Sequence, residues 1–124
     1  MTGLLDRCGV FRALTVAWLL GIFYFSSQPT VPFPATVWGL DKILHFGAYA
    51  GLAVVMFPAH RRWREQPARW AVSVALWAAL YGISDEFHQM FVPGRTATVA
   101  DFLADAAGAS FGAWAMFRFA ARRS

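Results

Sequence analysis

One stretch decides how the chain folds: YGISDEFHQMFVPGR, residues 81–95. It follows an apolar run and places two carboxylates, an imidazole, an amide and a guanidinium close together. On a helix, Tyr81, Asp85 and His88 share one face, because they are four and then three residues apart. The proline–glycine pair near the end predicts that the helix stops there, since proline lacks the N–H and glycine permits a turn. In a soluble protein this would be a solvated helix end, so its meaning depends on the rest of the chain.

The composition is typical of a membrane protein. Of the 124 residues, 58% are hydrophobic and only 15% are charged, whereas a soluble domain has roughly 45–50% apolar and about 25% charged residues. The length fits one domain, residues 1–124. The net charge of +4 does not predict nucleic-acid binding, because the arginines flank apolar runs and form no single basic face. Cys8 is the only cysteine, which excludes a disulfide framework within one chain.

Four apolar runs predict an all-α protein with membrane spans over approximately residues 10–27, 41–58, 70–89 and 101–119. The first run resembles a signal peptide, but it ends in bulky aromatic residues where cleavage needs small ones, so we expect a retained helix. The apolar cores of the runs are shorter than the ~20 residues of a span. Each helix must therefore extend into the neighbouring polar motif, whose side chains would face the protein interior and not lipid.

The basic residues predict the orientation. With the N-terminus in the cytoplasm, nine of the eleven basic residues fall on the cytoplasmic side, which is a strong positive-inside pattern. These nine are Arg7, Arg12, Arg61, Arg62, Arg64, Arg69, Arg118, Arg122 and Arg123. Four spans return the C-terminus to the same side. The sequence thus predicts an integral membrane four-helix antiparallel bundle with both termini cytoplasmic.

This orientation brings many polar residues to the outer ends of the second, third and fourth helices. We expect them to form a binding cluster, because ionisable groups in a membrane are costly and mark functional sites. The cluster comprises Asp41, Lys42, His45, Tyr49, Asp85, Glu86, His88, Gln89, Arg95, Asp101 and Asp105. The alternative is that these residues only tie the helix ends together by hydrogen bonds.

Two further features predict contacts between helices. Gly108 and Gly112 continue the face that carries Asp101 and Asp105, so this face should point into the bundle. Arg95 follows the turn after the third helix, and its planar guanidinium suits a carboxylate of Asp85, Glu86 or Asp101. We therefore expect Arg95 to join the third helix to the fourth. A second glycine pair, Gly47 and Gly51, also has the spacing of a close helix contact.

The motifs resemble those of the VanZ-like family along nearly the whole chain. The matching residues are Ser26-Ser27-Gln28-Pro29, Asp41-Lys42, His45-Phe46, Tyr49, Tyr81-Gly82, Asp85-Glu86, His88-Gln89, Pro93-Gly94-Arg95, Asp101 and Gly108. The resemblance implies a small multi-pass protein of the bacterial cytoplasmic (inner) membrane. The name-giving member is associated with resistance to teicoplanin, a glycopeptide antibiotic that acts on cell-wall precursors. One position departs from the pattern: Asp105 stands where the family is expected to have Asn.

Three functions remain open for the cluster. In the first, it binds a cell-wall precursor, an envelope glycan or a glycopeptide and contributes to teicoplanin-type resistance. Its five acidic side chains outnumber its two basic ones, which suits hydroxyl-rich sugars, amines or a divalent cation. Another hypothesis is that the protein is a structural partner of another membrane protein.

The second hypothesis is a membrane enzyme that acts on a lipid-linked (phospho)glycan. A histidine would be the general acid or base, oriented by a carboxylate. The catalytic candidates are His45, Asp85, Glu86 and His88, and the same four residues are the candidate metal ligands. A divalent cation held there would bridge to phosphate. The sequence predicts no other cofactor, and its partners would be the lipid bilayer and the envelope ligand.

Overall fold

The computed structural model describes residues 2–29 and 39–123, and within these residues it contains four α-helices and no strand. The helices are α1 (Thr2–Ser26), α2 (Leu40–Met56), α3 (Pro67–Gln89) and α4 (Val99–Arg122), and a short 3₁₀ helix, η1 (Phe57–Ala59), follows α2. The all-α prediction is therefore confirmed. Most of the segment between α1 and α2, which contains three prolines, falls outside the described residues.

The helix boundaries follow from local chemistry. α2 ends at Met56, directly before η1, because Pro58 within η1 has no N–H to continue the helical bonding. α3 begins three residues earlier than expected, at Pro67, whose fixed backbone angle suits the first turn of a helix. At the start of α4, the Thr98 hydroxyl accepts a hydrogen bond from the Asp101 N–H at 3.1 Å. α1 also begins earlier than expected, at Thr2.

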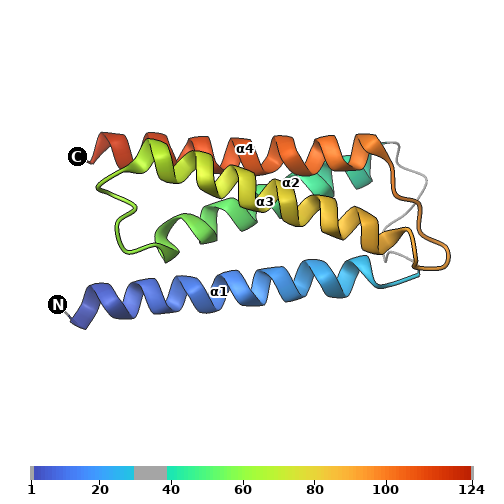
Figure 1. The fold of residues 1–124 in the computed structure, drawn as a ribbon, viewed down its shortest axis with the longest axis horizontal. Helices are drawn as coiled ribbons and strands as arrows, with labels where there is room; N and C mark the ends of the chain where they lie inside the picture. The colour runs from blue at the N-terminus through green and yellow to red at the C-terminus, as the bar shows by residue number, and fades with distance from the viewer. Residues whose placement is uncertain (1, 30–38, 124) are drawn as a thin grey trace.

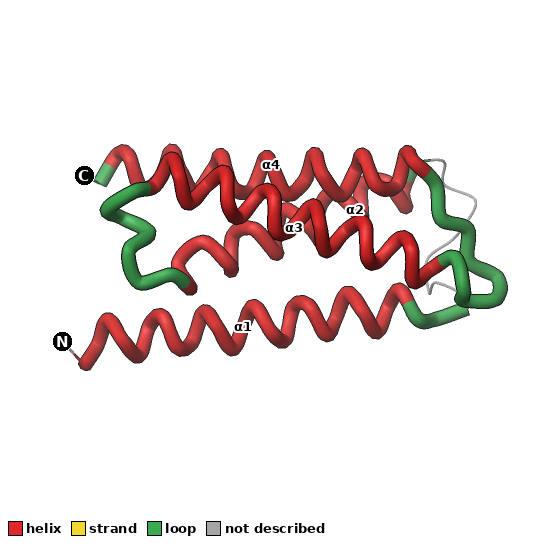
Figure 2. The backbone as a smooth tube through the Cα atoms, in the orientation of Figure 1, coloured by secondary structure: helices red, strands yellow, loops and turns green. Residues whose placement is uncertain are grey.

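The helices lie alongside one another, and successive helices run in opposite directions (Figure 1). Both termini and the connection between α2 and α3 lie at one end, whereas the connection between α3 and α4 lies at the other (Figure 2). The core contains two clusters of buried side chains. One includes Phe57 and Val74, and the other includes Tyr49, Leu52 and Ala109. α2, α3 and α4 supply most of this core, and α1 lies against it through Ile22.

Large apolar side chains point outward from all four helices. On α3, Leu76 and Trp77 are more than 60% exposed, and Phe111 and Trp114 on α4 are more than half exposed. Two helical segments, Arg7–Ser26 and Leu40–Ala59, are long and apolar enough to cross a membrane. An apolar outer surface of this kind marks contact with a membrane or another apolar partner. Both observations agree with a membrane protein.

α4 packs against α2 through its glycines. A Cβ atom at Gly108 would overlap the carbonyl group of Phe46, and one at Gly112 would overlap the carbonyl group of Ala50. The prediction that this face of α4 points into the protein is confirmed. The other glycine pair behaves differently, because Gly47 faces open space. The Gly47/Gly51 spacing therefore does not mark a close contact at both of its glycines.

We predict that Gly112→Leu lowers the thermal unfolding temperature of the protein in detergent. The added side chain has no room beside the Ala50 carbonyl, and overpacking costs about 1–3 kcal/mol or more when backbone must move. Gly47→Leu is the matched control, since no atom of another helix lies within 4 Å of its Cβ position. Circular dichroism melts of both variants check the expectation. Equal unfolding temperatures for the two variants would contradict the close contact between α2 and α4.

Candidate functional site

Three helices bring the predicted polar residues to one end of the molecule. The beginning of α2, the end of α3 and the beginning of α4 lie at the end opposite both termini (Figure 1). Four acidic side chains of this region are buried, namely those of Asp85, Glu86, Asp101 and Asp105. Buried carboxylates are expensive unless they are paired. The partners of each one therefore define what the site can do.

The centre of the site is a trio from three different helices: His45 of α2, Glu86 of α3 and Asp105 of α4. The Nδ1 atom of His45 lies 2.7 Å from Asp105 Oδ1 and 3.5 Å from Glu86 Oε1. Asp105 is fully buried, and Glu86 is 8% exposed. Both oxygens of Glu86 and Oδ2 of Asp105 are buried without a hydrogen-bond partner among the described residues. The trio thus places two buried carboxyl groups beside one imidazole.

Asp85 has a different partner from its neighbour Glu86. The Tyr49 hydroxyl of α2 donates a hydrogen bond to Asp85 Oδ2 at 3.1 Å, and both residues are buried. The ring of Tyr49 also contacts the ring of Tyr81 on α3. This pair ties the middle of α2 to the end of α3 beside the trio.

Lys42 bridges two of the remaining acids at the mouth of the site. Its Nζ donates to Asp41 Oδ2 at 2.6 Å and to Asp101 Oδ1 at 2.5 Å. Asp101 is buried, whereas Asp41 is exposed. Both acids stand in the first turn of their helices, where the helix dipole favours negative charge. Lys42 therefore bonds to both of these acids, next to the trio, in which three buried oxygens have no hydrogen-bond partner among the described residues.

His88 and Gln89 turn toward α1. His88 Nε2 lies 2.9 Å from the Ser27 hydroxyl, and the Gln89 amide donates to the Ser26 hydroxyl at 3.2 Å. The His88 ring also stacks on Phe23. Sequence reasoning did not place the two serines in the site, although they stand in the Ser26–Pro29 motif that carried the family resemblance. That motif is the signal that identifies them.

Arg95 does not join the carboxylates, so this expectation is wrong. Its Nη1 donates hydrogen bonds to the carbonyl oxygens of Phe25 at 2.8 Å and Gln28 at 3.1 Å. Among the described residues, the ion pairs of the buried acids involve Lys42 and His45. Arg95 instead bonds to one carbonyl in the last turn of α1 and to one just beyond the helix, where the chain supplies few N–H donors. The basic partner of Asp101 is Lys42.

The four expected metal ligands do not all meet. His45 and Glu86 lie together, but the third group beside them is Asp105. Asp85 bonds to Tyr49, and His88 bonds to Ser27. On a helix, Glu86 and His88 are two positions apart and face different neighbours. The His45–Glu86–Asp105 trio is thus the combination of imidazole and carboxylate groups that can share one ligand.

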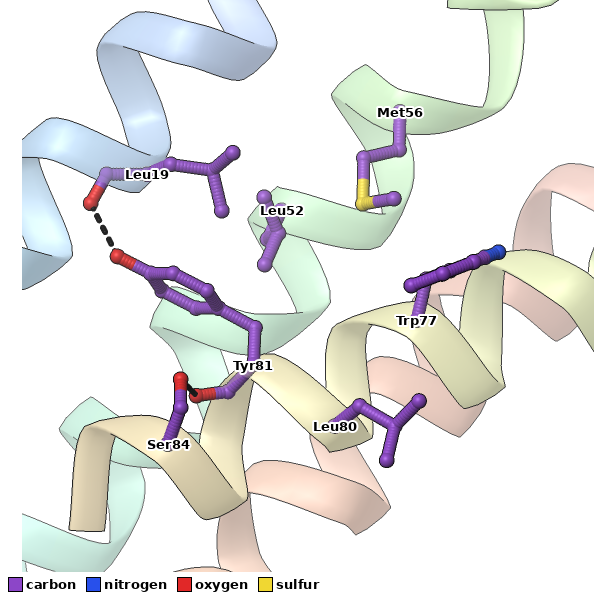
Figure 3. A pocket seen from close by; sticks show the side chains of 7 residues that line it. All are labelled: Leu19, Leu52, Met56, Trp77, Leu80, Tyr81 and Ser84. Atoms are coloured by element: carbon purple, nitrogen blue, oxygen red, sulfur yellow. Dashed lines mark hydrogen bonds between the residues drawn. The ribbon is translucent and has the colours of Figure 1, made fainter. Parts of the chain in front are cut away.

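An apolar groove of about 350 Å³ lies between α1, α2 and α3 (Figure 3). Its lining consists of Leu19, Leu52, Met56, Trp77, Leu80, Tyr81 and Ser84. The hydroxyls of Tyr81 and Ser84 already donate to the carbonyls of Leu19 and Tyr81, each at 2.7 Å. The groove therefore offers hydrocarbon surface and no unused hydroxyl donor, and the polar chemistry stays with the trio.

We predict that Arg95→Ala lowers the thermal unfolding temperature in detergent and that Arg95→Lys lowers it by a smaller amount. A net hydrogen bond contributes about 1 kcal/mol, and a cation at the C-terminal end of α1 also complements its dipole. Arg61→Ala removes the same charge from an exposed position at the other end and serves as control. Identical melts of Arg95→Ala and Arg61→Ala would exclude this stabilising role.

Comparison with known proteins gives one match. The family model described as VanZ/LLP1 matches residues 11–120, which include α2, α3, the trio and most of α1 and α4. No curated protein and no solved structure matches the chain. The match agrees with the resemblance carried by the sequence motifs and covers most of the chain. This protein therefore belongs to the VanZ/LLP1 family.

Proposed function

We propose that this protein crosses the bacterial cytoplasmic membrane four times, as an antiparallel bundle with both termini in the cytoplasm. The apolar side chains exposed on all four helices support four spans. α3 and α4 lack a stretch as long and apolar as those found at α1 and α2, because they carry the acids of the site. Those acids are buried against other helices, so they are not exposed to lipid, where charged groups are costly.

The distribution of basic residues supports this orientation. The termini and the connection between α2 and α3 lie together at one end of the molecule (Figure 2). Eight of the eleven basic residues belong to these segments or to the first or last two turns of the helices beside them, and a ninth, Arg12, donates to the carbonyl of Ala59 at the end of η1. An end rich in arginine favours the cytoplasmic side. The trio and Lys42 then belong to the outer side.

On that side, the cluster binds a component of the cell envelope or a glycopeptide and thereby contributes to glycopeptide resistance of the teicoplanin type. The observation that carries this proposal is the trio's set of buried carboxylate oxygens without hydrogen-bond donors. Unpaired buried acceptors favour a ligand that supplies donors or positive charge, because such groups are costly when left alone. Amines and sugar hydroxyls of envelope glycans and glycopeptides have the required chemistry.

A second candidate is an enzyme on a lipid-linked (phospho)glycan. It is favoured by the His45–Asp105 pair at 2.7 Å, because a carboxylate that holds one imidazole nitrogen orients the ring for proton transfer at the other. Glu86 stands next to the same ring. In this reading His45 is the general acid or base, and Asp105 is its positioning residue.

We predict the following topology. Reporter fusions placed after Gln66 and after Ser124 behave as cytoplasmic, and a fusion inserted within residues 30–35 behaves as external. The reason is the arginine-rich end described above. A phosphatase reporter, active only outside, and a fluorescent reporter, bright only inside, provide opposite readouts. Phosphatase activity at the Gln66 fusion would reverse the orientation and move the trio to the cytoplasmic side.

The function is tested by expressing the chain in a teicoplanin-sensitive host. We expect the wild-type protein to raise the inhibitory concentration of teicoplanin above that of the empty vector. Glu86→Gln should return it to the vector level, because the amide keeps the shape of the side chain but removes its charge. Ser84→Ala is the control, since this exposed hydroxyl bonds only within its own helix.

Immunoblots of membrane fractions establish that all variants are present in equal amounts. Wild-type protein that gives no resistance would contradict the glycopeptide role. Equal resistance with Glu86→Gln and Ser84→Ala would show that resistance does not depend on the trio.

A further inference from the structure

We infer that His45, Glu86 and Asp105 form a binding site for one divalent transition-metal ion. Each residue offers one ligand atom, and the three atoms lie within 4.8 Å of one another. Ligand nitrogen and oxygen atoms lie about 2.0–2.2 Å from a bound Zn²⁺ ion, so two ligands of a tetrahedral ion are roughly 3.4 Å apart. The Nδ1 atom of His45 lies 2.7 Å from Asp105 Oδ1 and 3.5 Å from Glu86 Oε1, distances on either side of this spacing.

The second observation is the set of unsatisfied oxygens. Glu86 Oε1, Glu86 Oε2 and Asp105 Oδ2 are buried and accept no hydrogen bond from the described residues. Asp105 has no exposed surface. Two carboxylates face one imidazole, which supplies at most one positive charge. A divalent ion beside a neutral imidazole balances both carboxylates and gives these oxygens a partner.

The neighbouring acids provide an internal comparison. Asp101 receives Lys42, and Asp85 receives the Tyr49 hydroxyl. These carboxylates are buried at the same end of the molecule, but each has a donor from another helix. Asp105 also receives His45 at one oxygen, but the buried oxygens without any hydrogen-bond partner among the described residues all belong to Glu86 and Asp105. This selectivity points to a ligand at the trio.

The donor set indicates the class of ion. Imidazole nitrogen suits Zn²⁺ and related transition metals and carboxylate oxygen suits Mn²⁺, whereas Ca²⁺ and Mg²⁺ are bound by oxygen ligands. Three protein ligands are also the number found in zinc sites that keep one position open. That open position would accept a phosphate, carboxylate or hydroxyl oxygen from the envelope ligand. This last step rests on the proposed function, whereas metal binding itself does not.

Metal binding is tested on the full-length protein in detergent. The chain is stripped with a chelator, exchanged into chelator-free buffer and titrated separately with Zn²⁺, Mn²⁺ and Mg²⁺. Metal content after gel filtration is measured by mass spectrometry. We expect about one equivalent of Zn²⁺ or Mn²⁺ per chain and little Mg²⁺. Bound metal should also raise the thermal unfolding temperature, because it binds the folded state.

Glu86→Gln and His45→Ala should lose the bound metal and its thermal shift. Asp85→Asn is the matched control, because it removes an adjacent carboxylate that bonds to Tyr49 and is not a ligand. Asp41→Asn is a second control, from an exposed position at the same end. Gel-filtration profiles show which variants are folded, and Glu86→Gln keeps the volume of the wild-type side chain. Cobalt absorption spectra of the wild-type protein report ligation by nitrogen independently of stability.

Two outcomes would overturn the site: folded wild-type protein that binds none of these metals, or equal metal content in Glu86→Gln and Asp85→Asn. The resistance assay and the metal-binding assay can fail independently of each other. Metal bound by the trio without any effect on teicoplanin sensitivity would keep the metal site and reject the proposed function. Resistance that depends on Glu86 without metal binding would do the reverse.

Discussion

The close contact between α2 and α4 is the constraint on which the polar cluster depends. Gly108 and Gly112 allow the backbone of α4 to reach the carbonyl groups of Phe46 and Ala50. Any side chain at these glycines would hold the two helices apart. In membranes, small residues at helix interfaces permit this kind of close backbone packing. The glycine face thus sets the distance at which the charged residues of both helices meet.

The register of this contact then determines the polar pairs. α2 and α4 run in the same direction, since one helix lies between them in the chain and successive helices alternate (Figure 1). Their first turns therefore lie side by side, and Lys42 reaches Asp101 while His45 reaches Asp105 one turn further on. α3 approaches the same place from the opposite direction and adds Glu86. Close packing and polar pairing are consequences of one geometry.

The sequence predicts the helices and the end of the protein at which the polar residues lie better than it predicts which residues pair with one another. Hydrophobic runs and proline positions suffice for the four helices, and the spacing of Asp101, Asp105, Gly108 and Gly112 suffices for the buried face of α4. Periodicity tells which residues share a face but not which neighbour that face meets. Arg95 shows this limit. Its turn was recognisable, but its bonds to α1 depend on where the end of that helix lies.

A carboxylate at position 105 can play two roles: it can accept a hydrogen bond from His45, and it can carry negative charge. The motif resemblance leads us to expect Asn here, and Asn would keep an oxygen that accepts from His45 while removing the negative charge. The hydrogen bond that orients the imidazole therefore does not require Asp. What Asp adds is a second carboxyl oxygen in a fully buried position, Oδ2, which has no hydrogen-bond partner among the described residues and lies beside a second carboxyl group whose two oxygens have none either. Among the described residues His45 is the one base beside both carboxyl groups, and buried charge is costly unless it is fully paired. The excess charge at Asp105 is thus explained by a ligand more readily than by the fold.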